Sequence, residues 1–332
     1  MLSTNHPGLT MDLSILIVTY NSAALIGPLL THLQRELADL SAEVVLLDNA
    51  SRDGTTALVA RDFPWVKLHA SARNLGFAAG NNAAAAKARG RYLLLLNPDA
   101  MPQPGSLRAA LQQLDACPDV GLAGGELLGT DGSRQPSARM FPRLQDEFFT
   151  LSGLAARYPG SATLARLDRR WANPDENAVV DWIPGAFVFV KREVFGQLDG
   201  FDEHFFMYYE EVDLCRRLQA QGLKIYYWPA LKATHIGGAS AKTVKTERLS
   251  RSGSQLESWR MRSGLLYYRK HHGALGAAGL HWLEWSWHKL RQLKARLKRQ
   301  PDRAEDFAAH CQQLKAAWHD TQAGRVSPPK PW

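Results

Sequence analysis

Short apolar runs alternate with segments of helical spacing through the first 125 residues, and this alternation limits the possible fold more than any other feature. The apolar runs occupy residues 13–19, 43–47, 65–69 and 91–96. Helical or alanine-rich patterns occupy residues 22–40, 54–62 and 77–89. Strands that are apolar on both faces and alternate with helices are typical of a parallel sheet covered on both sides. We therefore predict an α/β fold with a mostly parallel central sheet flanked by helices.

Polar residues follow three of these predicted strands, at the edge where a parallel sheet binds its ligands. They are Thr19, Tyr20 and Asn21 at the end of the first strand, Asp48 and Asn49 after the second, and Asn97 and Asp99 after the fourth. Asp99 is suited to coordinate a divalent cation that already holds a diphosphate, because Mg²⁺ and Mn²⁺ prefer oxygen ligands. The alternative is that Asn-Pro-Asp only turns the chain and caps the helix that follows.

Residues 73–82 form a Gly- and Asn-rich approach to the third predicted helix. Its glycines would let the backbone come close to a ligand, and Arg73 could neutralise a phosphate. Asp48 could accept hydrogen bonds from a nucleobase imide or a ribose hydroxyl. The alternative for residues 73–82 is a loop followed by tight helix packing, so this segment predicts a nucleotide site only together with the strand ends.

Residues 201–217 place aromatic side chains among carboxylates, which are Asp202, Glu203, Glu210, Glu211 and Asp213. Acids beside an apolar surface have raised pKa values, which suits a general base. The alternative is a helix start at which acids interact favourably with the N-terminal dipole. His235 follows a late predicted strand, and a lone histidine of this kind is more often structural than a metal or phosphate ligand.

The rest of the chain is less regular. Residues 126–180 predict loops and short helices, and residues 182–191 predict a strand near the far side of the sheet. Residues 211–221 predict a helix, which is followed by a strand at 223–228 and a turn into 233–235. The last eight residues, with three prolines, predict disorder.

The positive charge lies at the end of the chain. From Ala239 onward there are 18 Lys and Arg against 7 Asp and Glu, whereas the whole chain has a net charge of +8. Residues 279–299 predict a helix with Leu280, Leu283, Trp287, Leu290 and Leu297 on one face and a basic remainder. This pattern predicts a helix lying on an anionic membrane surface. The alternatives are docking onto the preceding domain and nucleic-acid binding, which the separation of the apolar residues from most cations disfavours.

Three widely spaced cysteines indicate neither a disulfide framework nor a structural metal, so a reducing cytoplasm fits best. We see no signal peptide, and no window approaches the length of apolar residues that a membrane-spanning helix needs. No GxxxxGK[ST] loop is present, which disfavours phosphoryl transfer.

Seven motifs together resemble the family 2 glycosyltransferases, particularly their rhamnosyltransferase-like branch. They are VTYN (18–21), LLDNASRDGT (46–55), RNLGFAAGNN (73–82), LLNPDA (95–100), IPGAFVFVKRE (183–193), GFDEHFFMYYEEVDLCRRLQAQG (200–222) and THIGG (234–238). The resemblance covers residues 12–240. It implies a GT-A fold, Rossmann-like in its nucleotide-binding part, that binds a nucleoside diphosphate sugar through a divalent metal, either Mg²⁺ or Mn²⁺.

The resemblance also implies roles for single residues. Asp99 falls at the last position of the family's D-x-D motif, with Asn97 in place of the first Asp, and His235 matches a histidine that meets the metal-diphosphate. Glu211 matches the catalytic base, with Glu210 as the alternative and Asp213 nearby. The nucleotide-sugar pocket would be formed by Thr19, Tyr20, Asn21, Asp48, Asn49, Arg73, Asn74, Gly76, Asn81 and Asn97. Trp182, Gly185 and Ala186 would border the acceptor pocket.

These features predict an inverting glycosyltransferase that extends a lipid-diphosphate-linked glycan of a bacterial surface polysaccharide, with deoxythymidine diphosphate rhamnose as the first candidate donor. We expect it in the cytoplasm, at the inner face of the membrane. The alternative is a non-catalytic nucleotide-sugar or carbohydrate binding module, which the presence of Asp99 and Glu211 disfavours. The expected divisions are a flexible N-terminus (1–11), a nucleotide-sugar-binding half (12–125), an acceptor-binding and catalytic half (126–240), a basic helical extension (241–324) and a disordered tail (325–332).

Overall fold

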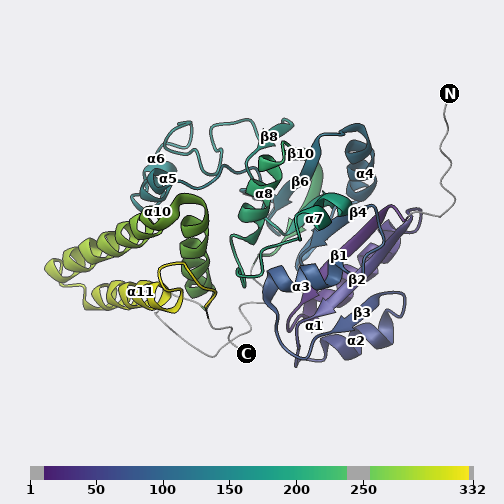
Figure 1. Cartoon of the computed structure of the whole chain (residues 1–332), viewed down its shortest axis with the longest axis horizontal. Coiled ribbons are helices and arrows are strands. Elements are labelled where there is room, and N and C mark those ends of the chain that lie inside the picture. Colours follow the sequence, from purple (N-terminus) through teal and green to yellow (C-terminus); the bar gives the residue numbers. More distant parts are fainter. Residues whose placement is uncertain (1–10, 238–254, 329–332) are drawn as a thin grey trace.

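The structure is a computed structural model that describes residues 11–237 and 255–328. Residues 11–237 form a sheet domain, and residues 255–328 form a helical arm at its side (Figure 1). Residues 1–10 of the predicted flexible N-terminus, residues 241–254 of the predicted basic extension and residues 329–332 of the predicted disordered tail lie outside the described residues. The division into domains stays a prediction. No helix within the described ranges is long and apolar enough to cross a bilayer.

The first half of the sheet domain contains the strands and helices in the predicted order. They are β1 (Leu13–Thr19), α1 (Ala23–Glu36), β2 (Ala42–Asp48), α2 (Thr55–Asp62), β3 (Lys67–Ala70), α3 (Gly76–Ala85) and β4 (Tyr92–Leu96). The second half contains β5 (Ala100–Pro102), α4 (Ser106–Ala116), β6 (Val120–Leu128), β7 (Arg134–Gln135), α5 (Leu144–Leu151), α6 (Leu154–Arg157), β8 (Ala178–Val180), β9 (Phe187–Lys191), α7 (Arg192–Gln197), α8 (Glu210–Ala220) and β10 (Lys224–His235).

All strands belong to one sheet with the order β3-β2-β1-β4-β9-β6-β10-β5, to which β7 and β8 add at β6 and β10. β3, β2, β1 and β4 run parallel, which confirms the predicted α/β fold. Thr19 pairs with Asp48 at the last position of the β1–β2 ladder, so both strands end at the same edge. The other half of the sheet is mixed, because β9 runs antiparallel to both β4 and β6.

Two predictions for the second half are wrong in detail. The strand expected at 182–191, near the far side of the sheet, begins at Phe187 and lies in the middle, between β4 and β6. Trp182 forms only an isolated bridge with Arg139, and Pro184 follows closely. The strand and turn expected over 223–235 are one strand, β10, whose pairing with β6 shifts register between Tyr227 and Lys232.

Hydrophobic cores lie on both faces of the sheet, because successive strand residues point to opposite sides. Ile15 and Ile17 of β1 pack with Leu29 and Leu33 of α1 on one face. Leu16 packs on the other face, in a core that also holds residues of α3, α8 and the helical arm. The arm is therefore joined to the sheet domain through a shared apolar core.

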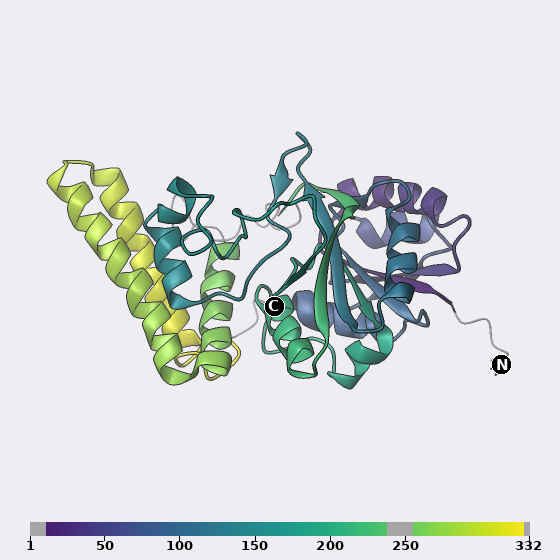
Figure 2. The same ribbon diagram turned by 90° about the horizontal axis from the view of Figure 1, so that it is seen from above.

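The helical arm consists of α10 (Gln255–Leu297) and α11 (Pro301–Asp320). α10 is kinked at Gly273, whose φ of 71° and ψ of −170° are not helical. Beyond the kink, α10 and α11 pack along each other and project away from the sheet (Figure 2). The predicted helix at 279–299 is thus part of this outer half of α10.

Candidate functional site

Asp48 organises the loop at the end of β1 and β2. Its buried carboxylate accepts hydrogen bonds from Thr19 Oγ1 (2.9 Å) and from the Ser51 backbone N–H (2.8 Å) and hydroxyl (2.5 Å). Asn21, with φ of 49°, accepts from the Arg52 N–H, and its own N–H donates to Ser51 Oγ. Both Asp48 oxygens therefore hold the loop in shape, and a direct contact between Asp48 and a nucleobase stays a prediction.

The segment 73–82 closes against this loop and against the segment before α8. Asn49 donates to the Gly76 carbonyl (3.0 Å) and is buried, as are Asn74 and Asn81. Gly76 has φ of 85°, and a Cβ there would lie 2.4 Å from the Phe206 carbonyl oxygen. Only glycine fits this close approach. Arg73 is exposed at the rim, where its guanidinium is accessible to a phosphate.

Asp99 and His235 meet at the same edge of the sheet. His235 Nε2 lies 3.5 Å from Asp99 Oδ1, and both side chains are mostly buried. The Gln135 amide donates to the His235 carbonyl (2.7 Å), so its oxygen accepts the hydrogen of His235 Nδ1 (2.8 Å). In the neutral ring with its hydrogen on Nδ1, the lone pair is on Nε2, a buried atom without a hydrogen-bond partner in the described residues. No pattern in the sequence indicates Gln135 as a site residue.

This arrangement fits a divalent cation. A ring nitrogen held by a hydrogen bond on its far side and presented beside a carboxylate is a common ligand geometry. Within residues 11–237 and 255–328 no group of three His, Cys, Asp or Glu side chains gathers as a closed metal site. Two protein ligands suffice for an ion that also binds a diphosphate. The assignment of Asp99 and His235 as metal ligands stays a prediction.

Glu210 and Glu211, the first two residues of α8, each have a carboxylate oxygen without a hydrogen-bond partner in the described residues. In both residues this oxygen is Oε2, and it is buried. Burial raises the pKa of Glu211 to about 7, against the lowering effect of its own and the Val212 backbone N–H and of Arg139. Burial and the neighbouring Glu211 raise the pKa of Glu210 well above its ordinary value. Carboxyls with such pKa values are suited to accept a proton near neutral pH.

The segment Gly185–Ala186 lies between Glu211 and the Asp99 loop. The Asn97 N–H donates to the Ala186 carbonyl (3.0 Å). A Cβ added at the preceding residue, Gly185, would lie 4.0 Å from the Glu211 Cβ. Asn97, Gly185, Ala186 and Glu211 therefore lie side by side, as a site that joins a donor and an acceptor requires.

Trp182 is buried rather than open. Its indole N–H donates to the Met140 carbonyl (2.9 Å), and the Arg139 guanidinium lies over its ring, 4.5 Å from the centroid. Stacking of Trp182 on an acceptor sugar stays a prediction, and it would require Arg139 to move from that ring face. Arg139 also lowers the pKa of Glu211, although no sequence pattern selected it.

Asp213 is fully buried and paired, in contrast to Glu210 and Glu211. Its carboxylate contacts Arg217 (2.8 Å) on its own helix, and Lys270 (2.6 Å) and His271 (2.7 Å) on α10. Hydrogen bonds from His271 and Lys270 and the charge of Arg217 hold the pKa of Asp213 below its ordinary value despite burial. Asp213 thus ties α8 to the arm, and a catalytic role for it stays a prediction that its contacts do not favour.

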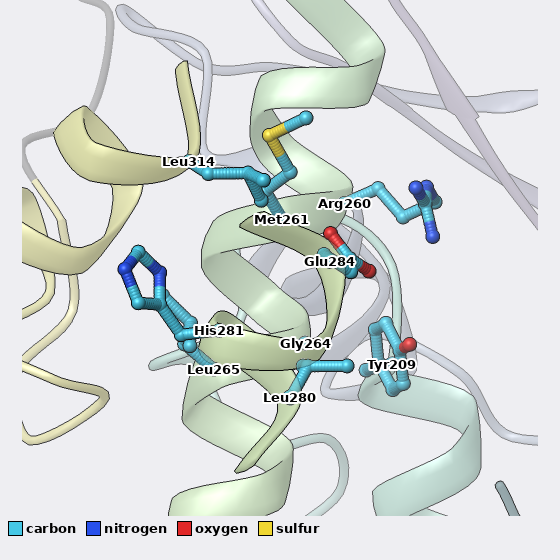
Figure 3. Close-up of a pocket in the computed structure, with 9 residues that line it drawn as sticks. All are labelled: Tyr209, Arg260, Met261, Gly264, Leu265, Leu280, His281, Glu284 and Leu314. Carbon is cyan, nitrogen blue, oxygen red and sulfur yellow. The ribbon is translucent and has the colours of Figure 1, made fainter. Parts of the chain in front are cut away.

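The arm also supports the turn that precedes Glu210. Tyr208 and Tyr209 both have left-handed backbones, with φ of 71° and 67°, which non-glycine residues rarely adopt. Ser263 of α10 donates to the Met207 carbonyl (2.7 Å), and the Tyr209 ring packs against Tyr267, 5.2 Å between centroids. Figure 3 shows Tyr209 beside Arg260 and Glu284 at a cavity of about 10 Å³, enough for one water molecule.

The chain is similar in sequence to proteins of one family. The family model for glycosyl transferase family 2 matches residues 14–166. An N-acetylglucosaminyl-diphospho-decaprenol L-rhamnosyltransferase of Mycobacterium tuberculosis is 34% identical over 246 residues, which cover 68% of this chain and 76% of the relative.

Solved structures confirm the GT-A fold. A mannosyltransferase from Pyrobaculum calidifontis in complex with GDP-Man and Mn²⁺ has a TM-score of 0.50 at 18% identity, covering 94% of this chain and 75% of that chain. GalNAc-T7 with UDP, GalNAc and Mn²⁺ has a TM-score of 0.53 at 13% identity, covering 97% of this chain and 59% of that chain. At these identities the likeness concerns the fold alone.

Proposed function

Because the chain belongs to glycosyltransferase family 2, we propose that it transfers a sugar from a nucleoside diphosphate to a hydroxyl of a lipid-diphosphate-linked glycan, with inversion at the anomeric carbon. Rhamnose from deoxythymidine diphosphate rhamnose is the first candidate donor. The mycobacterial relative supports this choice, because its name specifies rhamnose transfer to a diphospho-decaprenol-linked N-acetylglucosamine. The product would contribute to a bacterial surface polysaccharide.

The observation that carries this proposal is the buried Oε2 atom of Glu211, which has no hydrogen-bond partner in the described residues, on a side chain beside Gly185. Glu211 Oε2 would take the proton of the acceptor hydroxyl while that oxygen attacks the anomeric carbon. The bond from this carbon to the diphosphate oxygen breaks on the opposite side, and the nucleoside diphosphate leaves. One displacement inverts the anomeric centre, and no covalent enzyme intermediate is needed.

Asp99 and His235 would hold the diphosphate end of the donor. A divalent cation bound by their Oδ1 and Nε2 atoms would neutralise the charge on the leaving diphosphate. Arg73, at the exposed rim, would add a second positive charge for the phosphates. The Thr19–Asp48–Ser51 network would keep the nucleotide loop in its shape before the donor binds.

We also place the enzyme at the inner face of the cytoplasmic membrane, because a lipid-linked acceptor has to be reached there. The basic arm supports this location, since cations near an anionic bilayer are attracted to it.

The test is a transfer assay with purified protein, a panel of nucleotide sugars and a short-chain lipid-diphosphate N-acetylglucosamine, with Mg²⁺, Mn²⁺ or EDTA. We expect metal-dependent formation of one product, followed by mass. Asp99→Ala should abolish product formation and weaken Mn²⁺ binding in calorimetry, whereas Asp39→Ala, at an exposed carboxylate, should change neither. Binding of a nucleotide sugar without transfer to any acceptor would favour the binding-module alternative. If no nucleotide sugar binds, the proposed donor site is wrong.

A further inference from the structure

The outer half of α10 is amphipathic in an unusual sense, because its polar face is buried and its apolar face is exposed. The buried polar residues of this half are His281, Glu284, His288 and Gln292, and the rings of His281 and His288 contact Trp318 and His310 of α11. At 3.6 residues per turn they lie within about 80° of arc. On roughly the opposite side, Trp282, Leu290, Leu293 and Leu297 form a second stripe, which we call the apolar ridge. Each of these four side chains is 55–78% exposed.

The ridge differs from the apolar face that the sequence predicted. Leu280, expected on that face, is buried. Trp287 packs edge-on against Phe148, with centroids 6.1 Å apart. Leu290 and Leu297 are exposed as expected, and Trp282 and Leu293 join them. Four large apolar side chains in line on one helix are an exposed patch of the kind that marks an interaction surface.

A basic groove of about 910 Å³ runs beside the ridge, between α10, the beginning of α11 and the loop after α5. Its lining includes four cations, Arg291, Lys294, Lys298 and Arg303, against the single carboxylate of Asp306. None of the four forms an ion pair with a carboxylate in the described part of the chain, whereas Arg134, Arg166, Arg217 and Lys270 of the protein do. Trp287, Leu290 and Phe307 supply apolar walls to the same groove.

Leu290 belongs to both the ridge and the groove, so the two surfaces are continuous. Figures 1 and 2 show this part of α10 projecting away from the sheet domain, where a flat surface can reach it. An occupant has to offer an apolar phase to the ridge and phosphate charges to the groove at the same time. An anionic phospholipid bilayer has these two features together.

We infer that the groove binds the phosphate headgroup of an anionic phospholipid while the apolar ridge enters the adjoining acyl region. The inference deepens the membrane location of the proposed function and rests on it. It identifies the contacting residues, and these lie outside the sugar-transfer site. Single-stranded nucleic acid is the less suitable occupant, because three of the four ridge residues are leucines, which offer no surface on which bases stack.

The test is flotation of the full chain with vesicles of equal parts phosphatidylglycerol and phosphatidylcholine, without donor or acceptor. We expect binding that weakens as salt is added and is absent with phosphatidylcholine alone. Lys294→Glu/Lys298→Glu should weaken binding at least about 30-fold, from about fivefold for each cation removed. Leu293→Asn/Leu297→Asn should also weaken binding, and it should leave the salt dependence in place.

The matched control is Arg35→Glu/Lys87→Glu, which makes the same change in net charge at exposed positions of the sheet domain. It should bind vesicles about as well as the unaltered protein. Equal losses in both charge variants would overturn the inference in favour of attraction by net charge alone. So would charge-dependent binding of an oligonucleotide or of inorganic phosphate by the groove without any change in flotation.

Transfer to a short-chain acceptor is measured in parallel on each variant. We expect Lys294→Glu/Lys298→Glu to keep this activity, because none of its changes touches the sugar-transfer site. If the unaltered protein floats with vesicles but transfers no sugar, the lipid site is supported and the proposed reaction is contradicted. Transfer without flotation would overturn the lipid site and leave the reaction intact.

Discussion

The helix α1 and the outer half of α10 are both amphipathic, but they are oriented in opposite ways. In α1, Ile26, Leu29, Leu30 and Leu33 are buried against the sheet. In α10, His288 and Gln292 are buried, whereas Leu293 and Leu297 are exposed. The comparison shows that an apolar stripe identifies an interface without identifying its partner. For α1 the partner is the protein core, and for α10 we infer that it is an anionic bilayer.

The two regions are therefore stabilised by different contacts. A buried leucine of α1 contributes about 1.5–3 kcal/mol through removal from water. The α10–α11 interface relies in part on aromatic contacts, with the His288 and His310 rings stacked at 3.8 Å and His281 on Trp318 at 4.7 Å. We expect the arm to open locally at a lower free energy than the sheet.

The largest expected effect is in the first turn of α8, where the sheet domain buries carboxylates instead of apolar side chains. Glu211→Gln should lower kcat by about 10²–10⁴-fold, because the general base is lost. The same variant should be more stable at pH 8, by about 1–3 kcal/mol. A folded-state pKa raised from 4.5 to about 7 makes the folded state lose stability as pH rises between these values, and glutamine removes that loss.

Turnover and thermal denaturation over pH 5–8 check this prediction, and Glu193→Gln, at an exposed acid, should change neither. In the unaltered enzyme, kcat/KM should rise with pH through about 7 as Glu211 loses its proton. A variant that loses turnover and also becomes less stable at pH 8 would indicate that Glu211 is a structural residue.

The same substitution in the two helices tests the comparison directly. Leu30→Ala should destabilise the protein by about 2–5 kcal/mol, because a fully buried side chain leaves a cavity. Leu293→Ala should change the free energy of unfolding by less than about 0.5 kcal/mol, because its side chain is already exposed. Urea denaturation in the absence of lipid measures both. A large loss at Leu293 would mean that this face packs against protein in solution.

The sequence predicted the parallel half of the sheet because each strand and helix there has its own local pattern. Thr19, Asp48 and Asp99 are candidates for the same reason, since they lie at the end of an apolar run or within three residues after it. The position of β9 could not be predicted, because its antiparallel place between β4 and β6 depends on pairing with distant segments.

Site residues could be predicted where they lie in a recognisable motif. They could not be predicted where their role depends on a contact with a residue distant in the chain. Gln135 orients His235 across 100 residues of chain, and no periodicity indicates it. Asp213 looks like its neighbours Glu210 and Glu211 in sequence, but Lys270 and His271 from α10 contact its carboxylate. A helical projection of α10 shows two faces, and only the position of α11 determines which one is buried.

The smallest expected effect is a difference in pH dependence between the two regions. Burial lowers the pKa of His288 to about 4 and that of His310 to about 3, with the nearby cations Arg291 and Arg260 adding to the effect. Because these pKa values lie below the unfolded value of 6.5, their contribution to stability is complete above pH 6.5. It is lost as pH falls toward 4, by about 1–3 kcal/mol in all.

Carboxyls with raised pKa values have the opposite effect, because they make the folded state more stable as pH falls. Two of them, Glu257 and Glu284, lie in the arm itself. The histidine contribution is therefore isolated by comparing the protein with His288→Gln/His310→Gln. The free-energy difference between the two should shrink from pH 7 to pH 5. Amide hydrogen exchange should show α10 and α11 opening at pH 5 while β1 and β4 stay protected. The prediction is wrong if the stability of both proteins depends on pH in the same way, or if the sheet opens before the arm. Either result would mean that the two regions do not differ in their response to acid.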